Sequence, residues 1–209
     1  NIGNAFRVPS FTEKFSRYSY FFPNPDLKAE TAVEWETGIG IESQNFTLES
    51  VYYQRDVKDL IEWNMISNFM VKPINTGTAL IKGIELNISL KQQQHILSAN
   101  LNLIKAINQD NLPVISIPKY KWNIRLSNQL SKNILTYTEY QTIGGNILTI
   151  GSKNYLPDRK YLNMGTEITI QENSIICLSF NNILNNQAED QYGFPLPGQQ
   201  FFLSSTIQI

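Results

Sequence analysis

Residues 30 to 42 read Glu30-Thr31-Ala32-Val33-Glu34-Trp35-Glu36-Thr37-Gly38-Ile39-Gly40-Ile41-Glu42, an alternation of apolar and polar side chains. Successive side chains of a β-strand point to opposite faces of the sheet. One face of this strand therefore carries Val33, Trp35, Thr37, Ile39 and Ile41, and the other carries Glu34, Glu36, Gly38, Gly40 and Glu42. If the apolar face meets a protein core, the chain is a soluble sandwich. If it meets lipid, the chain is an outer-membrane barrel.

The same alternation recurs along the whole chain and predicts an all-β protein with no helix between the strands. Further strands are expected at 46–63, 78–91, 95–107, 118–131, 134–143, 160–171, 175–184 and 199–209, after a stub at 1–5. Most exceed the ~5 to 6 residues of a typical globular strand. They match the ~9 to 11 residues that cross a bilayer at a tilt.

The links between the expected strands alternate in length. Short turns are expected at 43–45, 92–94, 132–133 (Lys132-Asn133) and 172–173 (Glu172-Asn173), and longer links at 65–77, 108–117, 144–159 and 185–198. An up-and-down antiparallel sheet places alternate links at opposite rims, and outer-membrane barrels combine short periplasmic turns with long extracellular loops. The pattern therefore favours a membrane barrel over a sandwich with Greek-key connections.

Two further strands support a lipid-facing surface. Residues 78–90 place Leu80, Ile84, Leu86, Ile88 and Leu90 on one face, and residues 119–130 place Tyr120, Trp122, Ile124, Leu126 and Leu130 on one face. The opposite faces carry charges that a protein core would not accept. Aromatic residues near strand ends, namely Tyr120, Trp122 and Tyr161, are expected in an interfacial girdle.

Composition excludes several classes of function. The net charge of −1 gives no support for a nucleic-acid partner or a polybasic membrane patch. His95 is the one histidine and Cys177 the one cysteine, so a Ser-His-Asp centre or a zinc site is not expected, and no cofactor is predicted. No stretch approaches the ~20 apolar residues of a spanning helix. A passive porin and a soluble carbohydrate-binding β-sandwich remain as alternatives.

Several short motifs follow one another in a fixed order. The first is Phe6-Arg7-Val8-Pro9-Ser10, extended by Glu13 and Phe15, and the second is Asn24-Pro25-Asp26-Leu27-Lys28-Ala29-Glu30, followed by Gly38 in the next strand. Later motifs are Asp59-Leu60-Ile61, Asn75-Thr76-Gly77, Gly83-Ile84-Glu85, Asn181-Asn182-Ile183-Leu184-Asn185, Tyr192-Gly193 and Pro197-Gly198.

In order and spacing these motifs resemble those of TonB-dependent outer-membrane receptors, and among these the cobalamin and siderophore receptors. The resemblance implies part of a transmembrane barrel of about 22 strands in the outer membrane of a Gram-negative bacterium. It implies active uptake of a scarce nutrient chelate (siderophore-iron, haem or cobalamin), without catalysis. Gln199 departs from the arginine usual after Pro-Gly, and Ile209 from the usual aromatic end.

The resemblance also implies partners. Residues 1–209 are expected to form the C-terminal portion of the barrel, about nine to ten strands, without the plug domain, its TonB box or the earlier strands. The expected partners are those missing strands and the plug, TonB acting through the plug, outer-membrane lipid and a small-molecule metal chelate. An open sheet leaves unpaired backbone groups at its edges, which are costly in lipid, so the segment alone is expected to be unstable.

The resemblance places ligand contacts in a long extracellular loop. The candidates are Arg17, Tyr18, Tyr20, Phe21 and Phe22, because aromatic and cationic groups suit planar or anionic chelates. The alternative is that these side chains pack loop against loop. Glu34, Glu36, Arg55 and Arg125 are expected to face the lumen, where they either contact the plug or form a solvated wall.

Overall fold

The computed structural model describes residues 1–67, 70–115, 117–147, 155–171, 174–191 and 193–207. Glu172, Asn173, Tyr192 and Ile209, named above, lie outside the described residues, as do residues 148–154 of the expected link 144–159. No helix in the described part is long and apolar enough to cross a membrane.

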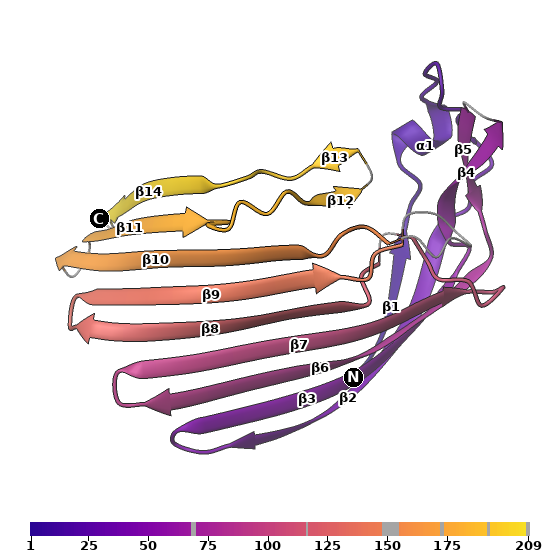
Figure 1. The fold of residues 1–209 in the computed structure, drawn as a ribbon. Helices are drawn as coiled ribbons and strands as arrows, with labels where there is room; N and C mark the ends of the chain where they lie inside the picture. Colours follow the sequence, from indigo (N-terminus) through magenta and orange to yellow (C-terminus); the bar gives the residue numbers. More distant parts are fainter. Residues whose placement is uncertain (68–69, 116, 148–154, 172–173, 192, 208–209) are drawn as a thin grey trace. The chain divides into compact units, whose positions relative to one another are not determined.

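Ten of the described strands form one antiparallel sheet in the order β1-β2-β3-β6-β7-β8-β9-β10-β11-β14, and two hairpins, β4–β5 and β12–β13, stand apart from it. Figure 1 shows these strands running side by side. Their bounds are β1 Ile2–Arg7, β2 Glu30–Glu42, β3 Phe46–Lys58, β6 Thr78–Gln92, β7 His95–Asn108, β8 Tyr120–Ser131, β9 Ile134–Gly144, β10 Arg159–Gln171, β11 Ser174–Asn181 and β14 Gln200–Ile207. The order is open, with β1 first and β14 last, so the predicted partial barrel of about ten strands is confirmed.

The chain divides into two compact units. The first unit contains residues 1–37, 52–83 and 105–114, and the second contains residues 38–51, 84–104 and 115–209. The short turns β2–β3, β6–β7 and β8–β9 all belong to the second unit, at one end of its strands (Figure 1). The first unit holds the long link between β1 and β2 and the link between β3 and β6.

The predicted apolar face is confirmed by exposure and by register. Val33 is 50% and Ile39 77% exposed on β2, as expected for side chains that meet lipid. In the second unit, Leu101 lies opposite Trp122, and Trp122 lies opposite Thr142. Tyr161, however, pairs with Gln141, which pairs with Asn123, so Tyr161 lies on the polar face. The prediction that Tyr161 belongs to the outward aromatic girdle was wrong. The face of a strand residue is set by its place in the alternation, not by its side-chain type.

The expected strand 46–63 is interrupted. β3 ends at Lys58, and Asp59 adopts a φ of 54°, a left-handed conformation that stops strand pairing. The chain then enters a separate hairpin of β4 Ile61–Ser67 and β5 Met70–Asn75. The expected link 65–77 therefore holds β5 and the end of β4, and the link 185–198 holds both strands of another hairpin, β12 Glu189–Gln191 and β13 Phe194–Pro195.

One short helix was not expected. α1 Phe11–Phe15 starts with a capping box, in which Ser10 Oγ accepts from the Glu13 backbone and the Glu13 carboxylate accepts from Ser10 N at 2.6 Å. The Ser10-x-x-Glu13 spacing carried this signal in the sequence. The helix belongs to the first unit, where buried apolar side chains gather around the long links: Leu27, Val57, Ile61, Ala79 and Val114.

Candidate functional site: a clasped loop and a carboxamide wall

Arg7, at the end of β1, joins two carboxylates in the first unit. Its Nε and Nη2 donate to the two oxygens of Glu30 at 2.7 and 3.1 Å, a bidentate pair. Its Nη1 donates to both oxygens of Glu13 at 3.1 and 3.2 Å. One guanidinium therefore ties helix α1 to strand β2.

The two carboxylates extend this junction. Glu30 Oε1 accepts a hydrogen bond from the Ile61 backbone N–H at 2.7 Å, which brings the start of β4 to the same point. Glu13 is only 7% exposed. Burial alone would raise the pKa of Glu13, but the hydrogen bonds from Ser10 and Arg7 outweigh burial and hold that pKa below its ordinary value.

Two asparagines fasten the following segment to the β4–β5 hairpin. Asn24 Nδ2 donates to the Pro73 carbonyl at 3.0 Å. Asn75 Nδ2 donates to the carbonyls of Asp59 at 2.7 Å and Lys28 at 3.2 Å, and its Oδ1 accepts from Lys28 N at 3.0 Å. We call Arg7, Glu13, Asn24, Glu30 and Asn75 the clasp. Its members come from the two first motifs and from Asn75-Thr76-Gly77, so these motifs have a structural role.

The remaining motif residues are placed as follows. In the first unit Pro9, Leu27 and Gly83 are buried, whereas Phe6 and Pro25 are exposed. In the second unit a Cβ at Gly38 would lie 3.0 Å from the Ser50 carbonyl oxygen and from Val51 Cγ2. Asn182 Nδ2 donates to the carbonyls of Asn186 at 3.1 Å and Pro197 at 3.2 Å, and a Cβ at Gly198 would lie 2.7 Å from Asn185 Oδ1. Except for the exposed Phe6 and Pro25, these residues are buried, closely packed or hydrogen-bonded within their own unit.

The candidate ligand residues lie beside the β4–β5 hairpin. Phe22 N donates to the Val71 carbonyl and Val71 N to the Tyr20 carbonyl, both at 2.9 Å. The Phe21 ring lies 5.1 Å from the Trp63 ring, edge to face. Loop and hairpin are therefore one packed element.

Within this element the candidates divide by exposure. Phe21 and Phe22 are half-buried, and the Arg17 guanidinium stacks 4.5 Å from the centroid of Phe22. Tyr18 and Tyr20 are 59% and 58% exposed. Packing occupies Phe21 and Phe22, and the two tyrosines and Arg17 stay accessible, so their contact with a ligand stays a prediction.

The hairpin adds exposed side chains that sequence reasoning missed. Trp63, Met65, Ile66 and Met70 are large, apolar and exposed. Their signal in the sequence was hidden because Trp63 was read as the end of one strand, 46–63, and Met65, Ile66 and Met70 as part of the link 65–77. Together with Tyr18 and Tyr20 they form what we call the aromatic edge of the first unit.

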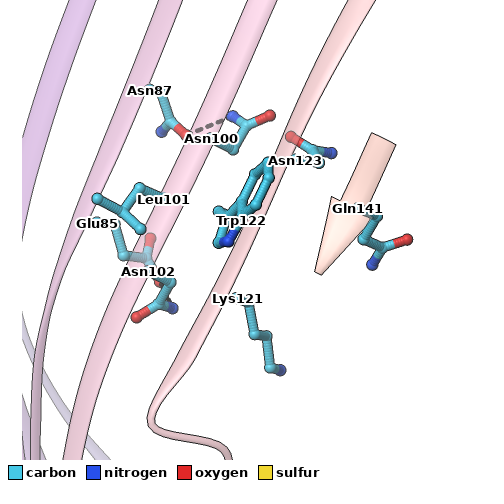
Figure 2. Close-up of a pocket in the computed structure, with 9 residues that line it drawn as sticks. All are labelled: Glu85, Asn87, Asn100, Leu101, Asn102, Lys121, Trp122, Asn123 and Gln141. Carbon is cyan, nitrogen blue, oxygen red and sulfur yellow. Dashed lines mark hydrogen bonds between the residues drawn. The ribbon is translucent and has the colours of Figure 1, made fainter. Parts of the chain in front are cut away.

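A row of carboxamides crosses the polar face of the second unit. Asn100 pairs with Asn123 across β7 and β8, and Asn123 with Gln141 across β8 and β9. Figure 2 shows this row, with Asn100 Nδ2 donating to Asn87 Oδ1 at 2.6 Å. It borders a hollow of about 230 Å³, where Glu85 accepts from Asn102 at 2.8 Å. Within the described residues Asn123 Oδ1 has no hydrogen-bond partner. The wall thus offers neutral donors and acceptors.

The charged candidates on the polar face are paired. In the first unit Arg55 forms an ion pair with Glu34, and Glu36 Oε1 accepts from Asn1 Nδ2 at 2.7 Å. In the second unit Arg125 Nη1 lies 3.6 Å from Glu139 Oε2, and its guanidinium stacks 3.9 Å from the centroid of Tyr137. Pairing within the wall reduces the charge that any of these side chains offers to another surface.

Groups for metal chemistry are sparse. The described residues hold no cluster of three or more His, Cys, Asp or Glu side chains placed to bind a metal. His95 Nδ1 lies 2.6 Å from Asn128 Oδ1, and Cys177 is a half-buried free thiol.

Comparison with known proteins gives the family. Residues 1–183 match the family model described as "TonB dependent receptor-like, beta-barrel". The vitamin B12 transporter BtuB of Vibrio vulnificus is 26% identical over 210 residues, covering 99% of this chain and 33% of BtuB. The chain therefore spans about a third of the length of this curated relative.

Solved structures share the fold. The copper transporter OprC superposes with a TM-score of 0.80 at 17% identity, covering 99% of this chain and 36% of OprC. The siderophore receptor PirA of Acinetobacter baumannii gives 0.72 at 15% identity, covering 99% and 38%. The family match excludes the soluble sandwich. The chain belongs to the TonB-dependent receptors, as part of the β-barrel that these proteins form in the outer membrane.

Proposed function

We propose that the protein carrying this segment actively takes up a scarce nutrient chelate across the outer membrane, powered through TonB and without catalysis. The observation that carries the proposal is the aromatic edge, in which Tyr18 and Tyr20 stand exposed on a loop fastened by the clasp. Fixed aromatic side chains bind a planar ligand with little loss of conformational entropy.

The proposed ligand belongs to the cobalamin or siderophore class. Relatives support this range, since one is a vitamin B12 transporter and others are receptors for siderophores. Arg17 stands exposed beside the aromatic edge and supplies a cation for an anionic chelate. We infer direct ligand contact for Arg17, Tyr18 and Tyr20, with Phe21 and Phe22 behind them.

We further infer that residues 1–209 form the C-terminal portion of the barrel. The coverage of about a third of BtuB supports further strands and a plug domain elsewhere in the same protein. Glu34, Glu36, Arg55 and Arg125 would then face the plug, through which TonB acts. The intact mass of the protein in native outer membranes tests this inference. A product several times larger than 23.9 kDa supports it, and a product of this mass would remove it.

The uptake proposal is tested with the full-length protein in a strain lacking its own cobalamin and siderophore receptors, with and without TonB. Cyanocobalamin and ferric enterobactin are supplied as radiolabelled probes. We expect TonB-dependent uptake of one of them, and equal uptake with and without TonB would instead favour a passive porin. Y18A/Y20A should lower the affinity for that probe at least about tenfold, whereas F194A, an exposed aromatic on β13, should leave it unchanged.

A further inference from the structure

Three segments of the first unit meet at the Arg7 guanidinium. Helix α1 reaches it through Glu13, strand β2 through Glu30, and strand β4 through the Ile61 N–H that binds Glu30. The aromatic edge is carried by the two segments that leave this junction, residues 16–28 after α1 and the hairpin that begins with β4. Both segments that carry the aromatic edge therefore start near the Arg7 junction.

The charges at the junction do not cancel. One cation faces two carboxylates, and the side chains of Glu13 and Glu30 are only 9% and 14% exposed, against 44% for Arg7. Because both carboxylates are largely removed from water, their mutual repulsion is screened far less than at a free surface. The guanidinium places one positive charge against both carboxylates.

We propose that Arg7 is a positioning residue for the aromatic edge, which it holds in one arrangement by neutralising Glu13 and Glu30 together. The link from position to ligand affinity rests on the uptake function proposed above. The holding action itself does not, because every contact that performs it lies within the first unit. The side-chain hydrogen bonds of Arg7 go to Glu13 and Glu30, so it acts on the aromatic edge through α1 and β4.

The geometry calls for arginine. Three nitrogens of Arg7 donate in different directions, Nε and Nη2 to Glu30 and Nη1 to Glu13. A lysine ammonium is a compact charge without this planar fork, so it can pair closely with only one of the two carboxylates. R7K should therefore fall between the wild type and R7Q.

The test is hydrogen exchange of the full-length protein in detergent, without ligand, read over residues 16–28 and 61–67. In R7Q we expect exchange to rise at least about tenfold in both segments, since charge-assisted bonds are lost and two carboxylates are left facing each other. In R7Q/E13Q the repulsion is gone and glutamine still serves the capping box, so protection should return to within about threefold of the wild type.

The double variant separates positioning from simple packing. If Arg7 acted only by filling space, E13Q would not restore protection, and an R7Q/E13Q protein that exchanges like R7Q would overturn the proposal. So would an R7Q protein that exchanges like the wild type. K58Q, which removes an exposed cation of β3 in the same unit, should exchange like the wild type.

Assembly and ligand identity are controlled separately. Heat-modifiable migration in gels reports whether each variant forms its barrel. If R7Q does not form its barrel, the hydrogen exchange of R7K is used to test the proposal instead. R7K exchange equal to the wild type then overturns the proposal, and intermediate exchange supports it. Binding of cyanocobalamin is measured in parallel. If the wild type does not bind cyanocobalamin, the proposal that cobalamin is the ligand is wrong. The exchange measurement still tests the positioning role of Arg7, because it is made without ligand.

Discussion

At the scale of single residues, Gly165 of β10 lies against the ring of Tyr137, which leaves no room for a side chain at this position. A Cβ at this position would lie 2.4 Å from Cε1 of Tyr137, whose ring covers the glycine and also stacks with Arg125. The three residues lie at positions of the polar face in the second unit, where Arg125 also pairs with Glu139. The Tyr137 ring fills the space beside Gly165 and stacks on the Arg125 guanidinium.

Replacing this glycine should therefore destabilise the barrel. G165A forces the Tyr137 ring away and breaks its stacking on Arg125, and we expect a loss of about 1 to 3 kcal/mol. Urea unfolding of the full-length protein in lipid vesicles measures the change. G40A is the matched control, because the nearest atom to its added Cβ, the Leu48 carbonyl oxygen, is 3.7 Å away. Equal unfolding curves for G165A and G40A would contradict the role of the ring.

Glu13 gives a pH prediction at the same scale. Its pKa in the folded protein lies below the ordinary value of 4.5, so its ionised form stabilises the docked loop above that value. This stability should be fully present from pH 7 to about pH 5 and be lost as the pH falls through the folded pKa. Pulsed hydrogen exchange of residues 16–28 measures it. The same acid-dependent loss in E13Q would show that another group is responsible.

At the scale of elements, the sequence predicted the strands of the ten-stranded sheet better than the structure of the long links between them. Alternation places whole strands because every second residue reports the same face, so errors at single positions such as Tyr161 do not move a strand. The break at Asp59 escaped prediction, since the following residues keep the alternation within a separate hairpin. Helix α1 escaped because its one turn is too short for a helical period, although its capping box was visible.

The residues of the clasp could be found in the sequence as members of the motifs, but their contacts could not. Arg7, Glu13 and Glu30 stand in the motifs, but the hydrogen bond from Arg7 to Glu30 spans 23 residues and that from Ile61 N to Glu30 spans 31, and no local pattern reports such pairs. The same holds for Asn24 and Pro73. The sequence also named Phe21, and not Trp63, which covers it.

The β4–β5 hairpin offers a prediction of its own. Asn75 makes three hydrogen bonds that join the hairpin to residues 28 and 59, so N75A should free the hairpin and lower its stability by about 1 to 3 kcal/mol. Limited proteolysis of the full-length protein should then cut within 61–75 at least several-fold faster. N64A is the control on the same hairpin, because the side chain of Asn64 makes no hydrogen bond within the described residues, whereas its backbone pairs with β5. Equal cleavage of the two variants would remove Asn75 from the clasp.

At the scale of the whole molecule, the sheet order ends at β1 on one side and β14 on the other. Each unpaired backbone group at such an edge costs several kcal/mol in lipid. The segment 1–209 expressed alone should therefore form no stable barrel, whereas the full-length protein should. Heat-modifiable migration and protease resistance after refolding into vesicles measure this. A stable monomer of the segment alone would mean that the edges pair with each other.

The carboxamide row of the second unit has a mechanical consequence. An amide side chain is both donor and acceptor, and rotation about its last torsion exchanges the two. A polar surface that slides past Asn87, Asn100, Asn123 and Gln141 could exchange a hydrogen bond with one amide for a hydrogen bond with the next, and none of these four side chains carries a charge. Such a wall can donate or accept a hydrogen bond at each of these positions, whichever kind of polar group lies against it.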